Sequence, residues 1–286
     1  MNDTMIRFWQ PSDLPDLREI FSVCFGDPPE TAEAFHRTFL AAPENCMLAA
    51  VPEDGKPEGR PAAAAYCLPG AGLCFPERRI PSVYLYAFGC LPEYRGRGLM
   101  KRVYTALFEE AGRQAPASCI IPASDALMQA YNRSGFTFAP LGRIRAAEIG
   151  GTAAREAESL PAERIPWREY ALRREEWLKP YPHADYPDSF YELSAEYGYV
   201  FLSMPGALAA VLPLEDRCVA AELLCPSADP ARALAGAAAI CPAEKYEVRT
   251  PAFFPGPGEI CPYAYWRETS GTMSGTGDFW YPFGLE

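Results

Sequence analysis

The sequence predicts an α/β protein made of two domains, and three observations lead to that prediction. Residues 83–91 are apolar and uncharged, residues 92–98 form a basic glycine turn, and a helical repeat of apolar residues begins at 99. Strand-like and helix-like segments alternate through the rest of residues 1–150. The 286 residues are enough for two modest domains, and the small and charged residues 151–163 are typical of a linker between them.

The turn at residues 92–98 has the clearest chemistry. Its two arginines and two glycines lead into a helix, and the candidate ligand-binding residues are Arg95, Gly96, Arg97, Gly98, Leu99, Met100 and Lys101. The first N–H groups of a helix have no partner inside the helix, and the helix dipole adds positive potential there. Because glycines let a ligand approach closely, this pattern favours a phosphate or pyrophosphate. The alternative is a surface turn with arginines, since neither GxxxxGK[ST] nor a GxGxxG after a strand is present.

The first half is expected to follow the order β-α-α-β-β-β-α-β-α-β-β. Apolar patterning predicts strands at residues 5–9, 46–51, 62–68, 83–91, 118–121, 136–138 and 144–149. Helices are expected after Pro11 with Ser12 as the N-cap, over 30–40, from 99 onward, and from Ser124 to the stop at 134–135. This alternation is of about one domain's size.

The second half is expected to repeat that architecture in a degenerate form. Helices are predicted at 166–179, 187–197 and 229–240, and strands at 199–203, 208–214, 219–224, 246–250, 263–267 and 278–285. In this half no basic glycine loop follows a strand. Residues 164–286 are therefore expected to lack the anion site.

The charge is unevenly spread, and it argues against nucleic acid as a partner. The net charge of −11 divides into −2 for residues 1–150, with 15 basic and 17 acidic side chains, and −9 for residues 151–286, with 11 and 20. A protein that binds nucleic acid usually carries a basic surface. An acidic half is compatible with a cationic small-molecule substrate, although most acidic surfaces only keep a protein soluble.

The ten cysteines and two histidines limit the redox and metal chemistry. No two cysteines form a CxxC pair, which favours reduced thiols in the cytoplasm over a disulfide framework. With only His36 and His183, neither a zinc site nor a Ser/His hydrolase is favoured, and no metal is expected. The N-terminus has no apolar signal core and no run reaches about 18 apolar residues, so neither export nor a membrane span is indicated.

The string PEYRGRGLM after an apolar strand resembles the acetyl-CoA signature [QR]xxGx[GA] of the GCN5-related N-acetyltransferases (GNAT). Arg95 and Gly98 match, and Met100 stands where Gly or Ala is usual. The resemblance is closest to the tandem acetyltransferases of the enhanced-intracellular-survival type, and it covers residues 5–150 well and 164–286 loosely. It implies a GNAT domain at 1–150 that binds acetyl-CoA, a linker at 151–163, and a second GNAT-like domain at 164–286 without the coenzyme motif.

Residues 126–136, ALMQAYNRSGF, resemble motif B of the same family. There a helical Tyr before a GF pair protonates the leaving thiolate of CoA, and the resemblance assigns that role to Tyr131. The pKa of a phenol, about 10, lies just above that of a thiol, about 8.5, so a tyrosine is well matched to act as the general acid for a leaving thiolate. A packing role is the alternative for Tyr131. Ser124 stands where the family often has a pantetheine-binding Asn, and it is equally suited to capping the helix.

The resemblance also implies that the strand before the loop splays away from its neighbour and exposes an edge to the pantetheine. Here that edge would be Phe88, Gly89 and Cys90, with one N–H group holding the thioester oxyanion. A glycine inside a strand suits a bulge or a close ligand approach, or it reflects a lack of room. Cys90 could suggest an acetyl-enzyme, but a buried strand thiol is more often inert.

No general base is evident from the residues. Glu93 follows the strand but is expected to face solvent beside the loop. Tandem relatives return their C-terminus to the first domain's pocket, so the resemblance makes Glu286 a candidate. The apolar tail DFWYPFGLE could equally form a strand that completes the second domain's sheet.

Together these observations predict an acetyl-CoA-dependent N-acetyltransferase that moves acetyl to a primary amine by direct attack in a ternary complex. The acceptor is expected to be a small amine, with cationic amines favoured by the acidic second half. Two rivals are a non-catalytic acyl-CoA-binding or regulatory module, and an aminoacyl transferase on tandem GNAT-like domains that uses charged tRNA. The net charge and the loop disfavour the second rival.

Overall fold

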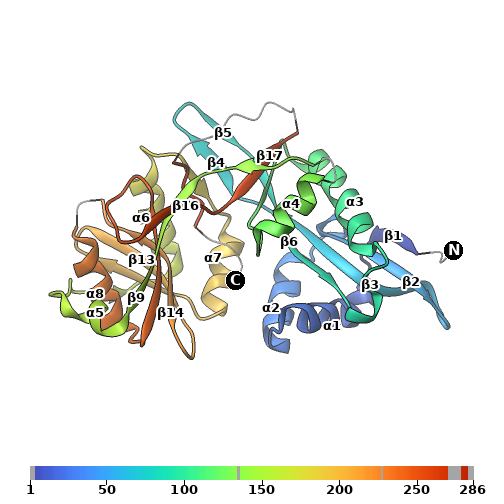
Figure 1. Ribbon diagram of the computed structural model, residues 1–286, viewed down its shortest axis with the longest axis horizontal. Coiled ribbons are helices and arrows are strands. Elements are labelled where there is room, and N and C mark those ends of the chain that lie inside the picture. Colours follow the sequence, from blue (N-terminus) through green and yellow to red (C-terminus); the bar gives the residue numbers. More distant parts are fainter. Residues whose placement is uncertain (1–3, 134–135, 227, 270–277, 283–286) are drawn as a thin grey trace. The chain divides into compact units, whose positions relative to one another are not determined.

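The computed structural model describes residues 4–133, 136–226, 228–269 and 278–282 (Figure 1). The chain divides into two compact units that are each discontinuous in sequence. The first comprises residues 1–71, 81–138 and 266–273, and the second comprises residues 72–80, 139–265 and 274–286. The architecture is mixed α/β, with a seven-stranded sheet at the centre of each unit.

The first sheet has the strand order β1-β2-β3-β6-β7-β17-β8. Its strands are β1 (Met5–Phe8), β2 (Cys46–Glu53), β3 (Lys56–Pro69), β6 (Ser82–Cys90), β7 (Ala117–Ile120), β17 (Tyr265–Glu268) and β8 (Ala139–Pro140). The pairs from β1 to β6 are antiparallel, and β6 and β7 are parallel. The helices are α1 (Leu14–Phe25), α2 (Pro29–Phe39), α3 (Leu99–Gln114) and α4 (Asp125–Arg133).

Helices α1 and α3 cover opposite faces of this sheet (Figure 1). The ring of Phe88 on β6 lies 6.1 Å from the ring of Phe108 on α3. A Cβ on the next residue, Gly89, would instead lie 3.0 Å from Ile20 on α1. Because successive strand residues face opposite sides, the two helices bury the two faces of β6.

The start of α1 departs from the sequence prediction. Ser12 is exposed and does not cap the helix, because it lies inside a 3-10 turn, Pro11–Asp13, in which Gln10 and Asp13 form a capping box. The buried Asp13 carboxylate accepts from the Gln10 N–H at 2.7 Å and from Arg7 at 2.6 Å. An ion pair therefore ties the first turn to β1. The strand expected at 136–138 is also absent, and pairing begins only at β8.

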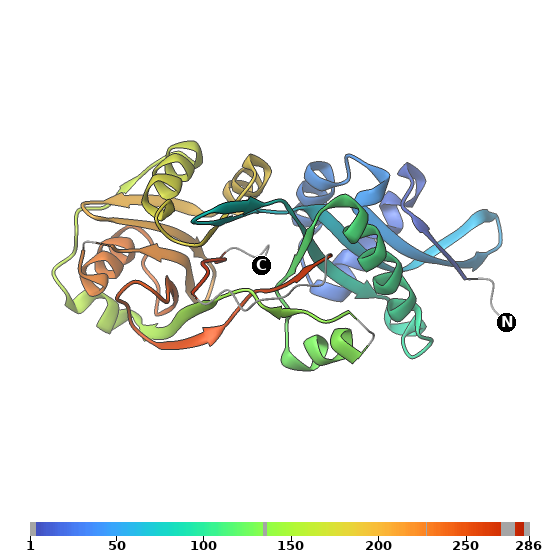
Figure 2. The same ribbon diagram turned by 90° about the horizontal axis from the view of Figure 1, so that it is seen from above.

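The second sheet has the order β10-β12-β13-β14-β15-β9-β16. Its strands are β10 (Glu163–Arg164), β12 (Val200–Met204), β13 (Ala207–Pro213), β14 (Cys218–Leu224), β15 (Lys245–Pro251), β9 (Arg143–Gly150) and β16 (Glu259–Pro262). Its helices are α5 (Gly151–Glu156), α6 (Trp167–Leu178), α7 (Asp188–Glu196) and α8 (Pro230–Ile240). Residues 151–163, expected as a linker, begin with helix α5, which lies beside α8 in both views (Figures 1 and 2). The helix forms there because Ala154 is buried in the core that α8 covers.

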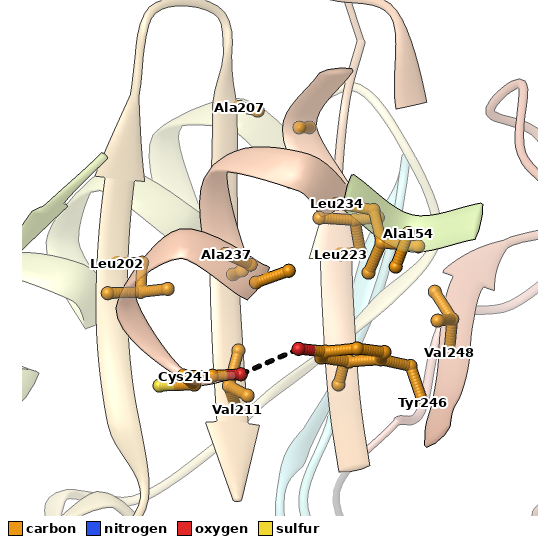
Figure 3. Close-up of a cluster of buried hydrophobic side chains, with 14 of the residues drawn as sticks. Ala154, Leu202, Ala207, Val211, Leu223, Leu234, Ala237, Cys241, Tyr246 and Val248 are labelled. Carbon is orange, nitrogen blue, oxygen red and sulfur yellow. Dashed lines mark hydrogen bonds between the residues drawn. The ribbon is translucent and has the colours of Figure 1, made fainter. Parts of the chain in front are cut away.

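That core is built from alternate residues of β12 to β15 packed against α8 (Figure 3). The hydroxyl of Tyr246 crosses to α8's end and donates to the Cys241 carbonyl at 2.8 Å. The alternation on β14 is interrupted, since Ala220 and Leu223 both face this core. A register shift in the β13–β14 ladder, where Val211 pairs with Ala220 and Ala210 with Glu222, accounts for the extra residue. The bulge therefore turns Glu222 to the opposite face of the sheet.

The buried Glu222 is the centre of a polar cluster beneath α6. It forms an ion pair with Arg174 at 2.8 Å, and both side chains are at most 1% exposed. Tyr170 and Trp280 also donate to the Glu222 carboxylate, and Arg174 donates to the Ala184 carbonyl at 2.7 Å. Burial of a charge is tolerated only where partners surround it, and Glu222 has three.

The two sheets follow the same strand scheme and exchange one strand. In each, a parallel pair follows an antiparallel series: β6 with β7 in the first, and β14 with β15 in the second. The next position in the first sheet is taken by β17, which follows the second sheet's β16 in sequence. The next position in the second sheet is taken by β9, which follows β8 of the first. Residues 263–267 were expected as a strand of the second domain, and the exchange places β17 in the first sheet instead.

A hairpin that the sequence analysis missed belongs to the second unit. Strands β4 (Gly72–Phe75) and β5 (Arg78–Ile80) pair with β11 (His183–Asp185) in a three-stranded sheet of order β11-β4-β5. In residues 278–282, the described part of the C-terminal segment, the strand pairing is a single bridge between Trp280 and His183. The strand expected at 278–285 is therefore reduced to that bridge within the residues the structure describes.

In the described residues, no helix is both long and apolar enough to cross a membrane.

Candidate functional site

The basic glycine turn adopts the backbone conformation that an anion site requires. It follows a short 3-10 turn at Pro92–Tyr94 and leads directly into α3. Gly96 has φ 75° and Gly98 has φ 73°, which lie in the left-handed region that favours glycine. A Cβ on Gly98 would meet nothing within 4 Å. Glycine is therefore needed there for its backbone conformation and for ligand access, not because neighbouring atoms leave no room.

The N-terminus of α3 is open to a ligand. Gly98 is the N-cap residue and supplies no side-chain hydrogen bond to the first turn. Leu99 is buried and Met100 half-buried, so both anchor the helix while their N–H groups face its N-terminal end. Lys101 is exposed on the same turn and adds a positive charge. These features suit a phosphate group.

The two loop arginines donate hydrogen bonds to backbone carbonyls of the turn and of the strand before it. Arg95 Nε donates to the Cys90 carbonyl at 3.0 Å, and Arg97 donates to the Glu93 carbonyl at 3.0 Å. The Arg97 guanidinium also lies 5.0 Å from the ring centre of Tyr94. Both arginines are exposed, so they shape the loop and keep positive charge at its surface.

In the second unit, the N-terminus of the equivalent helix is already capped by a side chain. Helix α8 follows β14 as α3 follows β6, but its N-cap is Asp229, whose carboxylate accepts from Ala231 and Arg232 N–H groups. A carboxylate in that position occupies the donors and repels an anion. The first-turn N–H groups therefore have no side-chain cap at α3, whereas at α8 a carboxylate accepts from them.

Strand β6 parts from β7 beside the loop. The parallel ladder runs from Ser82–Ala117 to Leu85–Ile120, and β6 continues to Cys90. Its other side stays paired with β3, where Ala64 lies opposite Gly89. Residues 86–90 thus present one edge of N–H and C=O groups, and this edge includes the expected Phe88, Gly89 and Cys90.

A bulge lies in that edge, two residues before the expected place. The β3–β6 register shifts between Ala64 and Tyr66, and Ala87 has φ 49°, which is unusual for a residue with a side chain. Gly89 is not the bulge. It is glycine because a Cβ would lie 3.0 Å from Ile20 and 3.3 Å from Cys24 of α1. Lack of room, one of the readings the sequence left open, explains it.

Tyr131 of α4 lies against the β6 edge. Its ring centre is 5.4 Å from that of Phe88 and 5.6 Å from that of Tyr104, and its side chain is 5% exposed. Burial, and to a smaller extent Tyr104, raises its pKa to about 12. The phenol is therefore protonated at neutral pH and can only donate a proton.

Ser124 is the cap of α4. Its Oγ accepts from the Leu127 N–H at 3.4 Å. Cys90 has its thiol directed to the Leu91 carbonyl at 3.6 Å, and burial, with Cys24 second, raises its pKa. A protonated thiol is a poor nucleophile, which disfavours an acetyl-enzyme. Glu286 and Gly135 lie outside the described residues.

Two polar residues of the first unit that burial affects escaped the sequence analysis as site candidates. Asp27 follows Gly26, the residue that ends α1, and Cys24 of the same helix packs against Gly89. Burial raises the pKa of its carboxyl. The other is His36 on α2, which is 3% exposed and bonds the Tyr66 hydroxyl through Nε2 at 2.8 Å. The signal in the sequence for a buried histidine was the position of His36 next to Phe35 and two residues after Ala34, both of which are buried apolar residues.

The stability of the first unit is expected to fall as His36 is forced to take a proton. Burial, with Arg18 second, lowers its pKa from 6.5 to about 4. The unfolded chain binds this proton below pH 6.5, whereas the folded chain binds it only below about pH 4. The contribution of neutral His36 to folding stability is therefore full above pH 6.5 and is lost between pH 6.5 and 4. It amounts to roughly 3 kcal/mol. Urea unfolding at pH 7 and 4.5 would show a smaller drop in His36→Gln than in the wild type. Equal drops would contradict this.

Comparisons with known proteins agree with this geometry. The model of the acetyltransferase (GNAT) domain family matches residues 5–139. A GCN5-related N-acetyltransferase from Kribbella flavida has a similar structure, with TM-score 0.69 and 17% identity, covering 93% of this chain and 71% of the other. One from Anabaena variabilis gives TM-score 0.67, 14% identity, and 93% and 73% coverage.

The structure of Eis1 from Mycobacterium abscessus is also similar, with TM-score 0.61, 13% identity, and coverage of 93% and 74%. At these identities the likeness shows a shared fold across both units. No curated protein sequence matches significantly. The family match, the open N-terminus of α3 and the parted strands lead to one conclusion: residues 5–139 form an acetyltransferase domain of the GNAT superfamily.

Proposed function

We propose that the protein transfers an acetyl group from acetyl-CoA to the primary amine of a small molecule. The observation that carries this proposal is the uncapped N-terminus of α3, with left-handed Gly96 and Gly98, beside the open edge of β6. N–H groups at Leu99, Met100 and Lys101 would hold the pyrophosphate. The second unit, with its matching strand order and capped α8, would be a degenerate copy that binds no coenzyme.

In this proposal the β6 edge binds the pantetheine amides and orients the thioester. An N–H group near the bulge at Ala87 would hold the oxyanion while the neutral amine attacks the carbonyl carbon. A C–N bond forms, the C–S bond breaks, and Tyr131 donates its hydroxyl proton to the leaving sulfur. Ser124 is placed to cap α4 and keep Tyr131 in position, and its hydroxyl hydrogen remains able to reach a pantetheine amide. The attacking amine must lose a proton to a general base as the amide forms, and Glu286 stays a candidate for that base.

The acceptor is proposed to be cationic. Asp27 provides a half-buried carboxylate just after α1, the helix that packs against Gly89 of β6, and Phe25, two residues before it, is 42% exposed. A carboxylate with an aromatic neighbour suits an ammonium group. Polyamines and aminoglycosides are the amine classes to examine first.

Coenzyme binding is the first test. Calorimetry with acetyl-CoA and CoA is expected to give micromolar affinity for the wild type and a loss of at least about tenfold for the Arg95→Ala/Gly98→Trp variant, since a side chain strains the turn and covers the amides. Gly55→Trp is the matched control, because Gly55 has φ 80° and open space around it in a remote turn. It should bind normally.

No binding by the wild type would remove the coenzyme site and favour the tRNA-dependent alternative. Binding without release of CoA thiol in the presence of any amine would favour the non-catalytic acyl-CoA-binding module. Thiol release with a polyamine or an aminoglycoside would support both the reaction and the acceptor class.

A further inference from the structure

A cavity of about 530 Å³ lies in the second unit, lined by the three-stranded sheet and by α6. On the sheet, His183 pairs with Cys74 and Cys74 with Arg79, so three lining residues form one cross-strand row. Residues directly opposite each other in a ladder share a face, so this row lines one wall. The lining residues on α6 and its C-cap are Leu172, Glu175, Glu176 and Lys179. Their spacing of three, four and seven places them on one helix face.

The strand wall is positive, and the helix wall is negative on balance, with Glu175 and Glu176 against Lys179. Arg78 and Arg79 stand on the strand wall, and Arg79 is held by Asp185 at 2.5 Å. Glu175 and Glu176 stand on the helix wall, and within the described residues neither carboxylate has an ion-pair partner. Burial raises the pKa of the Cys74 thiol, and the Asp185 and Glu175 carboxylates raise it further. Glu175 therefore faces the strand wall across the cavity.

His183 adds a buried acceptor to the strand wall. Its side chain is buried, with 4% exposure, and Nδ1 lies 2.8 Å from the Tyr181 carbonyl. A carbonyl can only accept, so Nδ1 carries the hydrogen and Nε2 keeps a lone pair. Nε2 has no hydrogen-bond partner among the residues the structure describes. A buried acceptor without a partner is costly, and a donor on a ligand would remove that cost.

The rest of the lining is apolar and open to a side chain. Phe75 and Pro76 come from the turn of the hairpin, and Leu172 comes from α6. Leu172 is 71% exposed, which is unusual for a leucine on a packed helix and leaves apolar surface at the cavity's mouth.

We propose that this cavity binds a zwitterionic α-amino acid. The ligand carboxylate would lie against Arg78 and Arg79, and its ammonium would lie against Glu175 and Glu176 and donate to His183 Nε2. Its side chain would lie on Phe75 and Leu172. The site is separate from the coenzyme loop and does not depend on acetyl transfer.

The test is calorimetry with L-phenylalanine and two analogues that each lack one charge. N-acetyl-L-phenylalanine has no ammonium and L-phenylalaninamide has no carboxylate, so each should bind at least about tenfold more weakly than phenylalanine. The Glu175→Gln/Glu176→Gln variant should lose phenylalanine affinity by at least about tenfold. Glu158→Gln is the control, because this side chain is 86% exposed and lies outside the cavity, and it should bind as the wild type does.

A second measurement locates the ligand. Alkylation of Cys74 by iodoacetamide, followed on its peptide by mass spectrometry, should slow in saturating phenylalanine in the wild type and not in the double variant. Absence of binding at about 10 mM phenylalanine would overturn the proposal. Binding that neither the Glu variants nor the analogues weaken, or that leaves Cys74 unprotected, would also overturn it. Acetyl-CoA titration of the double variant should be unchanged, which separates this result from the coenzyme test.

Discussion

Replacing Glu222 with alanine is expected to destabilise the second unit by about 3–5 kcal/mol. The change leaves the Arg174 guanidinium, 1% exposed, without its carboxylate partner. The same change removes the acceptor of Tyr170 and Trp280. Three buried donors, including Arg174, therefore lose the carboxylate to which they all donate. Equilibrium unfolding in urea, followed by far-UV circular dichroism, would measure the loss.

Two further variants separate the buried pair from a general effect of removing a carboxylate. Asp216→Ala removes one of the two carboxylates paired with Arg217, a side chain that is 73% exposed, and should change stability by at most about 1 kcal/mol. The double variant Arg174→Met/Glu222→Leu should recover part of the loss, because it removes the stranded charge. If Glu222→Ala unfolded at the same urea concentration as the wild type, the cluster would have no role in stability.

The Tyr131→Phe variant is expected to keep coenzyme affinity and to lose turnover by at least about tenfold, within the range that general acid catalysis supplies. The phenol is protonated, with its pKa raised to about 12, and it lies against Phe88 of the open edge. The variant removes one oxygen and keeps the ring that packs against Phe88, Tyr104 and Phe108. A CoA-thiol release assay with the best amine, paired with calorimetry, would measure both quantities.

The position of Tyr131 allows a matched control. Tyr104→Phe removes the hydroxyl of a ring 5.6 Å from Tyr131 and should leave turnover near the wild-type value. An unchanged rate in Tyr131→Phe would end its role as the acid. The same loss in both variants would point to packing of the aromatic cluster, since the two rings share Phe108 as a neighbour.

The local features of the site could be predicted because the residues themselves impose them. An uncharged run from 83 to 90 forms β6, the left-handed turn needs Gly96 and Gly98, and the apolar repeat after Leu99 forms α3. Each of these depends on neighbours in sequence, so the strand, loop and helix were expected at the observed places.

The features that were missed depend on partners distant in sequence. The hairpin β4–β5 is short and its neighbour β11 begins more than 100 residues later, so nothing near residue 72 indicates it. Gly89 is explained by Ile20 and Cys24 on another element. Helix α5 has a linker's composition, and it is helical because Ala154 is buried against α8. Within a single sequence these long-range contacts leave no periodic signal.

The exchange of strands between the sheets bears on how the chain acquires its fold during synthesis. The first sheet contains β7, which ends at residue 120, and β17, which ends at residue 268. At about 5–20 residues per second, a ribosome needs roughly 7–30 s to produce the intervening 148 residues. Until then β7 has an unpaired row of backbone groups, which invites pairing with another nascent chain. The first unit is therefore the first to begin folding, but its sheet cannot be completed until nearly the whole chain has been made.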